Sequence, residues 1–216
     1  MDLNILIIDD HPIFREGLKS LVLNEPGMSI CGEAFSRESA IKVLKCCHPD
    51  VITLDLSLGD GSGLQLIKQI RAYDKKVKII ISSMHDELLF AERCIREGAN
   101  GYINKEQAST NIINAIRLVS KGELYLSDKM IKVLAQRQLD GGKNVGATPE
   151  ELLSNRELEV FLMIGQGLNT QKIANKLHLS SKTIDTHKEH IKRKLSIQDS
   201  STLIQRAVAW GLNRCE

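Results

Sequence analysis

The feature that most constrains the fold is an alternation, over the first 120 residues, of short apolar runs with longer segments of helical period. Each run is rich in Ile, Val or Leu, which is typical of parallel strands that helices cover on both faces. Strands alternating with helices predict an α/β domain with a doubly wound parallel (βα)5 sheet. The predicted strands span residues 4–8, 28–34, 51–55, 78–82 and 101–104. The first predicted helix starts at Pro12, and the other four cover roughly 37–46, 63–72, 87–97 and 109–121.

The pattern changes after Gly122. A short helix is predicted from about Ser127 to Gln138, and the polar, glycine-containing stretch "LDGGKNVGATPEE" that follows offers nothing to bury, as expected of an interdomain linker. From Ser154 onward every periodic segment is short and helical, which predicts a second, smaller all-α domain. The expected organisation is a first domain, a linker with a short helix, and a helical domain, over residues 1–121, 122–153 and 154–216.

Charge and cysteine usage narrow the class of protein. Residues 154–216 carry ten Lys or Arg against six Asp or Glu, whereas the first 153 residues carry nineteen against twenty-one, which hints at a polyanion partner for the C-terminal part. No apolar stretch approaches the ~18 residues that a membrane span needs, and the N-terminus has no signal-peptide pattern. The five cysteines lack metal-ligand spacing, which favours reduced thiols in a cytosolic compartment. We therefore expect a cytoplasmic protein without membrane contact.

Polar residues gather where the predicted parallel strands end, the edge at which doubly wound sheets bind ligands. Like charges so close together repel, so a cation or a lysine must offset them. Ligand sets made of oxygen alone favour Mg²⁺, which suggests phosphoryl chemistry. Asp55 is central and is the candidate nucleophile that forms an acyl phosphate, with Lys105 and the Ser83 hydroxyl stabilising the phosphoryl oxygens. The residues at these strand ends are Asp9, Asp10, Asp55, Ser82, Ser83, Tyr102 and Lys105.

Residues 1 to about 121 resemble a response-regulator receiver domain. The resemblance rests on "IIDDHP", the phosphoacceptor loop "DLSLGDGSG", "ISSMH" and "GYINK", which occur in the family's order and spacing. Two departures stand out: Gly59 occupies a position where the family usually has proline, and Glu106 replaces the proline often found after the lysine. Gly59 is expected to loosen the loop.

The resemblance also implies roles for individual residues. A sensor histidine kinase or a small phosphodonor would phosphorylate Asp55, and Lys105 would contact the phosphoryl group. Ser83 and Tyr102 would form the switch pair that responds. The implied Mg²⁺ ligands are the carboxylates of Asp10 and Asp55, Asp9 in support, and the backbone carbonyl of Ser57.

The helical tail contains a helix-turn-helix pattern between residues 170 and 195, since two helices are joined there by a very short turn. Ile184, Ile191 and Leu195 share one face of the second helix and are expected to pack inward. The other face is polar, so this helix could lie in a DNA major groove, with its first turns near base edges. Its polar residues are Lys182, Asp185, Thr186, Glu189, Lys192 and Arg193, flanked by Lys188 and Lys194.

About 60 residues from this region resemble the LuxR-type DNA-binding domain of NarL/FixJ regulators, through "RELEV", "GLNTQKIA" and "LSSKTIDTH". The resemblance implies a recognition helix over 180–195, binding to double-stranded DNA, and a homodimer formed through the last helix. Asp185 and Glu189 can accept hydrogen bonds from cytosine N4, so we expect them to shape sequence specificity. The implied DNA contacts are Lys182, Thr183, Thr186, Lys188 and Lys192.

The sequence therefore predicts a non-enzymatic, phosphorylation-dependent transcription regulator of a two-component system. One alternative is a Mg²⁺-dependent phosphohydrolase, but such an enzyme would need a second acidic residue two positions after its nucleophile, where this chain has Ser57. Another alternative is a receiver protein that signals only through protein contacts. The acidic residues Asp185 and Glu189 on the recognition helix give that alternative some weight.

Overall fold

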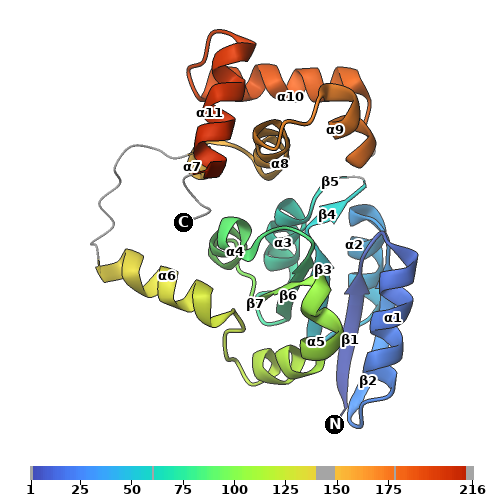
Figure 1. Ribbon diagram of the computed structural model, residues 1–216. Coiled ribbons are helices and arrows are strands. Elements are labelled where there is room, and N and C mark those ends of the chain that lie inside the picture. The colour runs from blue at the N-terminus through green and yellow to red at the C-terminus, as the bar shows by residue number, and fades with distance from the viewer. Residues whose placement is uncertain (1, 60, 140–148, 178, 213–216) are drawn as a thin grey trace. The chain divides into compact units, whose positions relative to one another are not determined.

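The computed structural model describes residues 2–59, 61–139, 149–177 and 179–212 (Figure 1). These residues fall into two compact units, one within positions 1–142 and the other within 143–216. The first unit is built on a five-stranded parallel sheet of order β2-β1-β3-β6-β7, which confirms the predicted doubly wound α/β class. The strands are β1 (Leu3–Ile8), β2 (Met28–Ala34), β3 (Val51–Asp55), β6 (Lys78–Ser83) and β7 (Gly101–Asn104).

Helices cover both faces of this sheet because its central strands are apolar on both sides, and every residue of β3 is buried. On one face α1 packs against α5, while α2, α3 and α4 succeed one another across the other (Figure 1). The helices of the first unit are α1 (Pro12–Leu23), α2 (Arg37–Cys46), α3 (Gly63–Tyr73), α4 (Glu87–Arg96), α5 (Lys105–Ser120) and α6 (Asp128–Leu139).

Two local predictions were wrong. The fifth sheet helix was expected from residue 109, but α5 begins at Lys105 because the Asn104 side chain accepts a hydrogen bond from the Glu106 N–H and caps the helix. The stretch after β3 was expected to be a loop, but it contains two short antiparallel strands, β4 (Ser57–Leu58) and β5 (Gly61–Ser62). The first difference moves Lys105 from a strand end to the first turn of a helix.

The chain after α5 stays attached to the sheet. The Tyr125 N–H donates to the Asn100 carbonyl at 3.0 Å, and the Tyr102 N–H donates to the Tyr125 carbonyl at 2.9 Å, so Tyr125 bridges to the outer edge of β7. Helix α6 then contacts α4, with the Met130 side chain fully buried. Within the stretch predicted to be a linker, residues 140–148 lie outside the described residues, and Pro149–Leu152 forms the short helix α7.

The second unit is helical, as predicted, and α8 lies at its centre in contact with α10 and α11. Gly165 ends α8 where a side chain would not fit, because an added Cβ would lie 2.6 Å from the Ala207 carbonyl oxygen of α11. The rings of Phe161 and Trp210 also pack between these two helices, 5.7 Å apart. The bounds are α8 (Asn155–Gly165), α9 (Thr170–Lys176), α10 (Ser181–Lys194) and α11 (Ser200–Leu212).

Within the described ranges, no helix combines the length and the apolar character that crossing a membrane requires. Four cysteines of the first unit are free thiols: Cys31, Cys46, Cys47 and Cys94.

Candidate functional site

The acidic residues meet at one edge of the sheet. Asp9 and Asp10 follow β1 and Asp55 ends β3, and because these parallel strands are neighbours, their carboxyl ends lie side by side. One ligand atom from each of Asp9, Asp10, His11 and Asp55 lies within 4.8 Å of the others. The structure therefore brings together the three carboxylates picked from the sequence, and adds an imidazole to them.

The Lys105 ammonium lies between two of these carboxylates. Its Nζ is 2.7 Å from Asp9 Oδ2 and 2.6 Å from Asp55 Oδ2, and it also sits 4.6 Å from the centroid of the Phe14 ring. All three charged side chains are buried, so the ammonium offsets carboxylate charges that would otherwise be costly to desolvate. A phosphoryl group on Asp55 would form beside this cation.

The Asp55 carboxylate has a different partner on each oxygen. The Ser57 N–H donates to Oδ1 at 3.1 Å, and Lys105 binds Oδ2. Burial raises the pKa of Asp55 to about 6, Lys105 opposes the rise, and the negative charge of Asp9 adds to it. Near neutral pH the group is therefore mainly an ionised carboxylate, the form that a nucleophile requires.

Replacing Asp55 with Asn should flatten the pH dependence of stability in the first unit. The folded-state pKa of about 6 exceeds the ordinary value of 3.8, so the folded state binds this proton more tightly than the unfolded chain does. The resulting stabilisation is fully present below about pH 4 and is lost as pH rises through about 6, by roughly 3 kcal/mol.

This loss can be measured by urea unfolding with a chelator present. The transition to follow is the unfolding of the first unit, which the fluorescence of Trp210 does not report because Trp210 lies in the second unit. The free energy of unfolding of the wild type, minus that of Asp55→Asn, should fall between pH 4 and pH 7. A difference that is constant over this range would contradict the assigned pKa.

The donor set suits a hard divalent cation. Three carboxylates converge, and oxygen ligands are those that Mg²⁺ prefers, usually one or two carboxylates together with waters and a phosphate oxygen. The Asp10 carboxylate is oriented toward the loop after β3, because its Oδ2 accepts from the Gly59 N–H at 2.9 Å. The residues present are therefore compatible with Mg²⁺.

Ser83 and Tyr102, the predicted switch pair, are joined through His85. The Tyr102 hydroxyl donates to the His85 carbonyl at 3.0 Å, and the His85 N–H donates to Ser83 Oγ at 3.2 Å. His85 Nε2 also lies 2.7 Å from Ser57 Oγ, in the loop after the nucleophile. One residue thus links the Asp55 loop to both members of the pair, and the sequence indicated no role for it.

The glycine at the start of α3 has a packing reason rather than a ligand-binding one. A Cβ on Gly63 would lie 2.6 Å from the Asp55 carbonyl oxygen and 2.8 Å from the Leu56 Cα, and its N–H donates to the Leu56 carbonyl at 2.9 Å. For Gly63 the close approach is to the backbone of β3 itself.

In the helical unit, α10 has the two faces that its sequence predicted. Ile184 and Ile191 are buried, and the opposite face is exposed. A buried carboxylate fixes α10 against α8: Glu157 forms a capping box with Ser154, and its Oε2 lies 2.6 Å from Lys194 Nζ. The exposed residues of α10 are Lys182, Asp185, Thr186, Glu189, Arg193 and Lys194.

The predicted DNA contacts differ in how free their side chains are. Lys188 Nζ donates to Thr170 Oγ1 of α9 at 2.5 Å, and the Lys192 side chain is only 14% exposed and pairs with Glu189 at 2.7 Å. The Thr183 hydroxyl lies 2.8 Å from Ser180 Oγ. The Thr186 hydroxyl donates back to the Lys182 carbonyl at 3.0 Å, while Lys182 itself is exposed.

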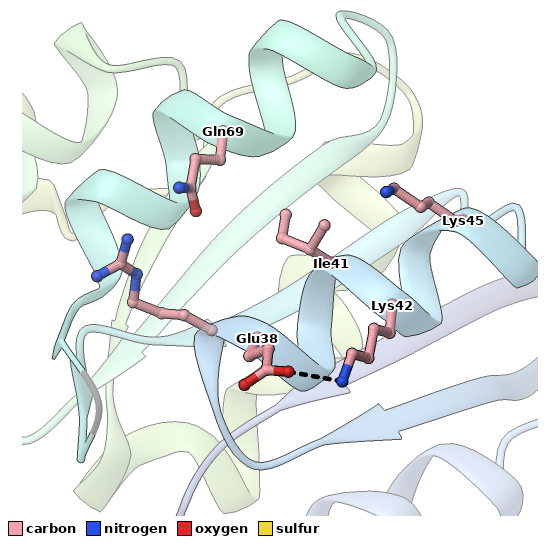
Figure 2. Close-up of a pocket in the computed structure, with 6 residues that line it drawn as sticks. Glu38, Ile41, Lys42, Lys45 and Gln69 are labelled. Atoms are coloured by element: carbon pink, nitrogen blue, oxygen red, sulfur yellow. Dashed lines mark hydrogen bonds and ion pairs between the residues drawn. The ribbon is translucent and has the colours of Figure 1, made fainter.

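An open hollow of about 470 Å³ lies between α2 and α3 (Figure 2). Glu38 and Lys42 form an ion pair at its rim, 2.6 Å apart. It contains none of the residues that the sequence analysis selected, so it contributes nothing to the site described above. Its lining residues are Arg37, Glu38, Ile41, Lys42, Lys45 and Gln69.

Comparison with known proteins matches both units. The family described as "Response regulator receiver domain" matches residues 5–117, and the family described as "Bacterial regulatory proteins, luxR family" matches residues 151–207. The response regulator UvrY of Escherichia coli (strain K12) is 31% identical over 214 residues, covering 99% of this chain and 97% of that protein. The oxygen regulatory protein NreC of Staphylococcus carnosus (strain TM300) is 32% identical, covering 95% and 97%.

A solved structure also matches over nearly the whole chain. RcsB from Salmonella enterica serovar Typhimurium, bound to promoter P1flhDC in the presence of the phosphomimetic BeF3⁻, superposes with a TM-score of 0.61 at 25% identity. The match covers 97% of this chain and 100% of that one.

Proposed function

Since the chain belongs to the response regulators that join a receiver domain to a LuxR-family DNA-binding domain, we propose that it is a phosphorylation-dependent transcription regulator of a two-component system. Its phosphodonor is a sensor histidine kinase or a small acyl phosphate. The observation that carries this function is the buried Asp55 carboxylate, which lies among two further carboxylates and 2.6 Å from the Lys105 ammonium.

In the proposed reaction an Asp55 oxygen attacks the phosphorus of the donor. The bond from phosphorus to the donor breaks, and an acyl phosphate forms on Asp55. Lys105 stabilises the negative charge on the transferred oxygens. Asp9, Asp10 and Asp55, with the Ser57 backbone carbonyl, would hold Mg²⁺, which supplies further positive charge to those oxygens when it is bound.

The response to phosphorylation would start at Ser83. Its hydroxyl turns toward the phosphoryl group, and this movement disturbs the hydrogen bond from the His85 N–H and, through His85, the bond from Tyr102. Phosphorylation then favours one of two arrangements of the loop before α4. The altered receiver surface would free or pair the DNA-binding domains.

DNA binding is assigned to α10, whose exposed polar face suits a major groove. The proposed contacts are Lys182, Thr183, Thr186, Lys188 and Lys192. A homodimer through α11 is supported by the apolar side chains that this helix leaves exposed, since Ile204 is 50% and Leu212 66% exposed while Leu203 and Ala207 pack against the rest of the unit.

The proposed domain organisation is a receiver over residues 1–121, a linker over 122–153 and a DNA-binding domain over 154–216. A regulator that binds chromosomal DNA in bacteria acts in the cytoplasm, which is the proposed location. The phosphohydrolase alternative is not favoured, because Ser57 stands where a second catalytic acid is needed. Turnover of a generic phosphomonoester by the protein would reverse that judgement.

Selection of bound duplexes from a pool of genomic fragments, with and without acetyl phosphate and Mg²⁺, tests the function as a whole. The phosphodonor should enrich a common set of fragments, because phosphorylation biases the pairing of the DNA-binding domains. Identical, unenriched pools under both conditions would contradict a phosphorylation-dependent DNA-binding function.

Replacing Lys182 with Ala should weaken binding to every duplex by a similar factor. Its exposed ammonium is suited to a phosphate, and losing one phosphate contact lowers the slope of log K against log salt by about 0.9. Titrations at several salt concentrations measure the slope, with Lys45→Ala in the receiver as the control. An unchanged slope would remove Lys182 from the DNA contacts.

A further inference from the structure

An exposed carboxylate lies near the start of α10, the helix that would enter the DNA groove. Asp185 is in the second turn of α10, five residues after the N-cap Ser180, and its side chain is exposed. A recognition helix places its N-terminal turns closest to base edges. Asp185 is therefore at the depth where side chains read bases.

Three lysines of α10 already have partners other than Asp185. Lys188 donates to Thr170, Lys192 pairs with Glu189, and Lys194 pairs with the buried Glu157. Among the residues that the structure describes, no cationic group lies within 4 Å of the Asp185 carboxylate. Glu189, one turn further on, is paired with its lysine, whereas Asp185 is paired with none of these three lysines.

A negative side chain in a groove between phosphates is unfavourable unless a hydrogen-bond donor faces it. In the major groove the bases offer two such donors, the N4 amino group of cytosine and the N6 amino group of adenine. The adenine amino group lies between two acceptors, its own N7 and the O4 of the paired thymine, which repel a carboxylate from both sides. The cytosine amino group has an acceptor on one side only, the O6 of the paired guanine. A carboxylate at this position therefore discriminates in favour of cytosine.

We propose that Asp185 is a specificity-determining residue that selects a cytosine in each half-site of the target DNA. This inference rests on the proposed function, because it requires α10 to lie in the major groove. The lysines near Asp185 would supply affinity for any duplex, and Asp185 would supply the choice of base.

The test compares full-length wild type, Asp185→Asn and Asp185→Ala by selection from a randomised duplex pool, in the presence of acetyl phosphate and Mg²⁺. The wild type should enrich cytosine at one position of each half-site. Asp185→Asn should shift that position toward adenine, because an amide can both accept from N6 and donate to N7. Asp185→Ala should lose the preference. The ratio of its affinity for cytosine duplexes to that for non-cytosine duplexes should fall by about five- to tenfold from the wild-type value.

The control is Asp199→Asn, which removes one exposed carboxylate of the same domain but leaves an oxygen to cap α11, where Asp199 now accepts from the Thr202 N–H at 2.9 Å. The control should retain the wild-type base preference, which separates base reading from a general change in charge. A switch confined to one base position is not a result that a structural role of Asp185 could produce.

Two negative results of this selection experiment would have different meanings. If wild type enriches a sequence and both Asp185 variants enrich the same bases at every position, the inference is overturned and the proposed function stands. If wild type enriches no sequence at all, the inference falls together with the DNA-binding function. A preferred base other than cytosine at the position that changes in the variants would also overturn it.

Discussion

Asp55→Asn will fail to form an acyl phosphate when incubated with acetyl phosphate and Mg²⁺, whereas wild type will acquire one phosphoryl group. Asparagine keeps the shape of the side chain but presents a neutral amide, which is a much poorer nucleophile than a carboxylate. It also removes the charge to which Lys105 Nζ is bound at 2.6 Å. Intact mass measurement gives the fraction modified, and release of the group by hydroxylamine identifies it as an acyl phosphate.

Asp86→Asn is the matched control for this experiment. Asp86 is a nearby exposed aspartate that caps α4 by accepting from the Leu88 N–H at 2.9 Å, and asparagine can keep that cap. The control should be phosphorylated as wild type is. Retention of a hydroxylamine-labile phosphoryl group on Asp55→Asn would remove Asp55 from its proposed role.

Gly165→Ala should destabilise the DNA-binding unit by at least about 2 kcal/mol, corresponding to a fall of roughly 10 °C or more in its unfolding temperature. The added Cβ would lie 2.6 Å from the Ala207 carbonyl oxygen and 3.0 Å from its carbonyl carbon, so the crossing of α8 and α11 must widen. Backbone cannot move aside as the end of a flexible side chain can. Fluorescence of the single tryptophan, Trp210, which packs on Phe161 in this crossing, reports the transition.

Gly211→Ala is the comparison variant, for which the expected change in the stability of this unit has the opposite sign. A Cβ at this position of α11 meets nothing within 4 Å, and alanine favours a helix over glycine by ~1 kcal/mol. The same substitution should therefore stabilise the unit at residue 211 and destabilise it at residue 165. If both variants melt alike, the close approach of the two helices does not limit the stability of this unit.

Much of the receiver fold could be predicted from the sequence because buried parallel strands leave a strong local signal. The run "VITLD" is apolar until its last residue, and β3 covers the same residues, 51–55. The start of α5 was predicted four residues too late, since apolar periodicity begins only after the first turn. Asn104 and Glu106, which begin the helix, form a capping contact rather than a periodic pattern.

The acidic cluster could also be predicted, because parallel strands bring their ends to one edge and the order of the strands follows from topology. The contacts of His85 could not be predicted from the sequence. They join residues 28, 2 and 17 positions away, at Ser57, Ser83 and Tyr102, through hydrogen bonds that leave no mark on hydrophobic periodicity. His11 had the one usable signal, its position directly after two aspartates at a strand end.

For the DNA-binding helix, the sequence separated the buried face from the polar one but could not tell which lysines are free. Lys188 binds a hydroxyl on another helix, 18 residues away, and Lys192 pairs on its own helix with a side chain of the polar face. Both contacts depend on the conformation of a long lysine side chain, which bends back to reach a neighbouring group. Helical spacing alone does not specify this.

The bridge between Tyr125 and β7 determines where the first unit can be shortened. The family match ends at residue 117, but a fragment ending there would leave the Tyr102 N–H without the Tyr125 carbonyl that accepts from it at 2.9 Å. It would also remove the bridge that Tyr125 makes to the outer edge of β7, and an uncovered edge is a template for pairing with a neighbouring molecule. A fragment that keeps this edge covered must therefore continue at least through Tyr125, eight residues beyond the end of the family match.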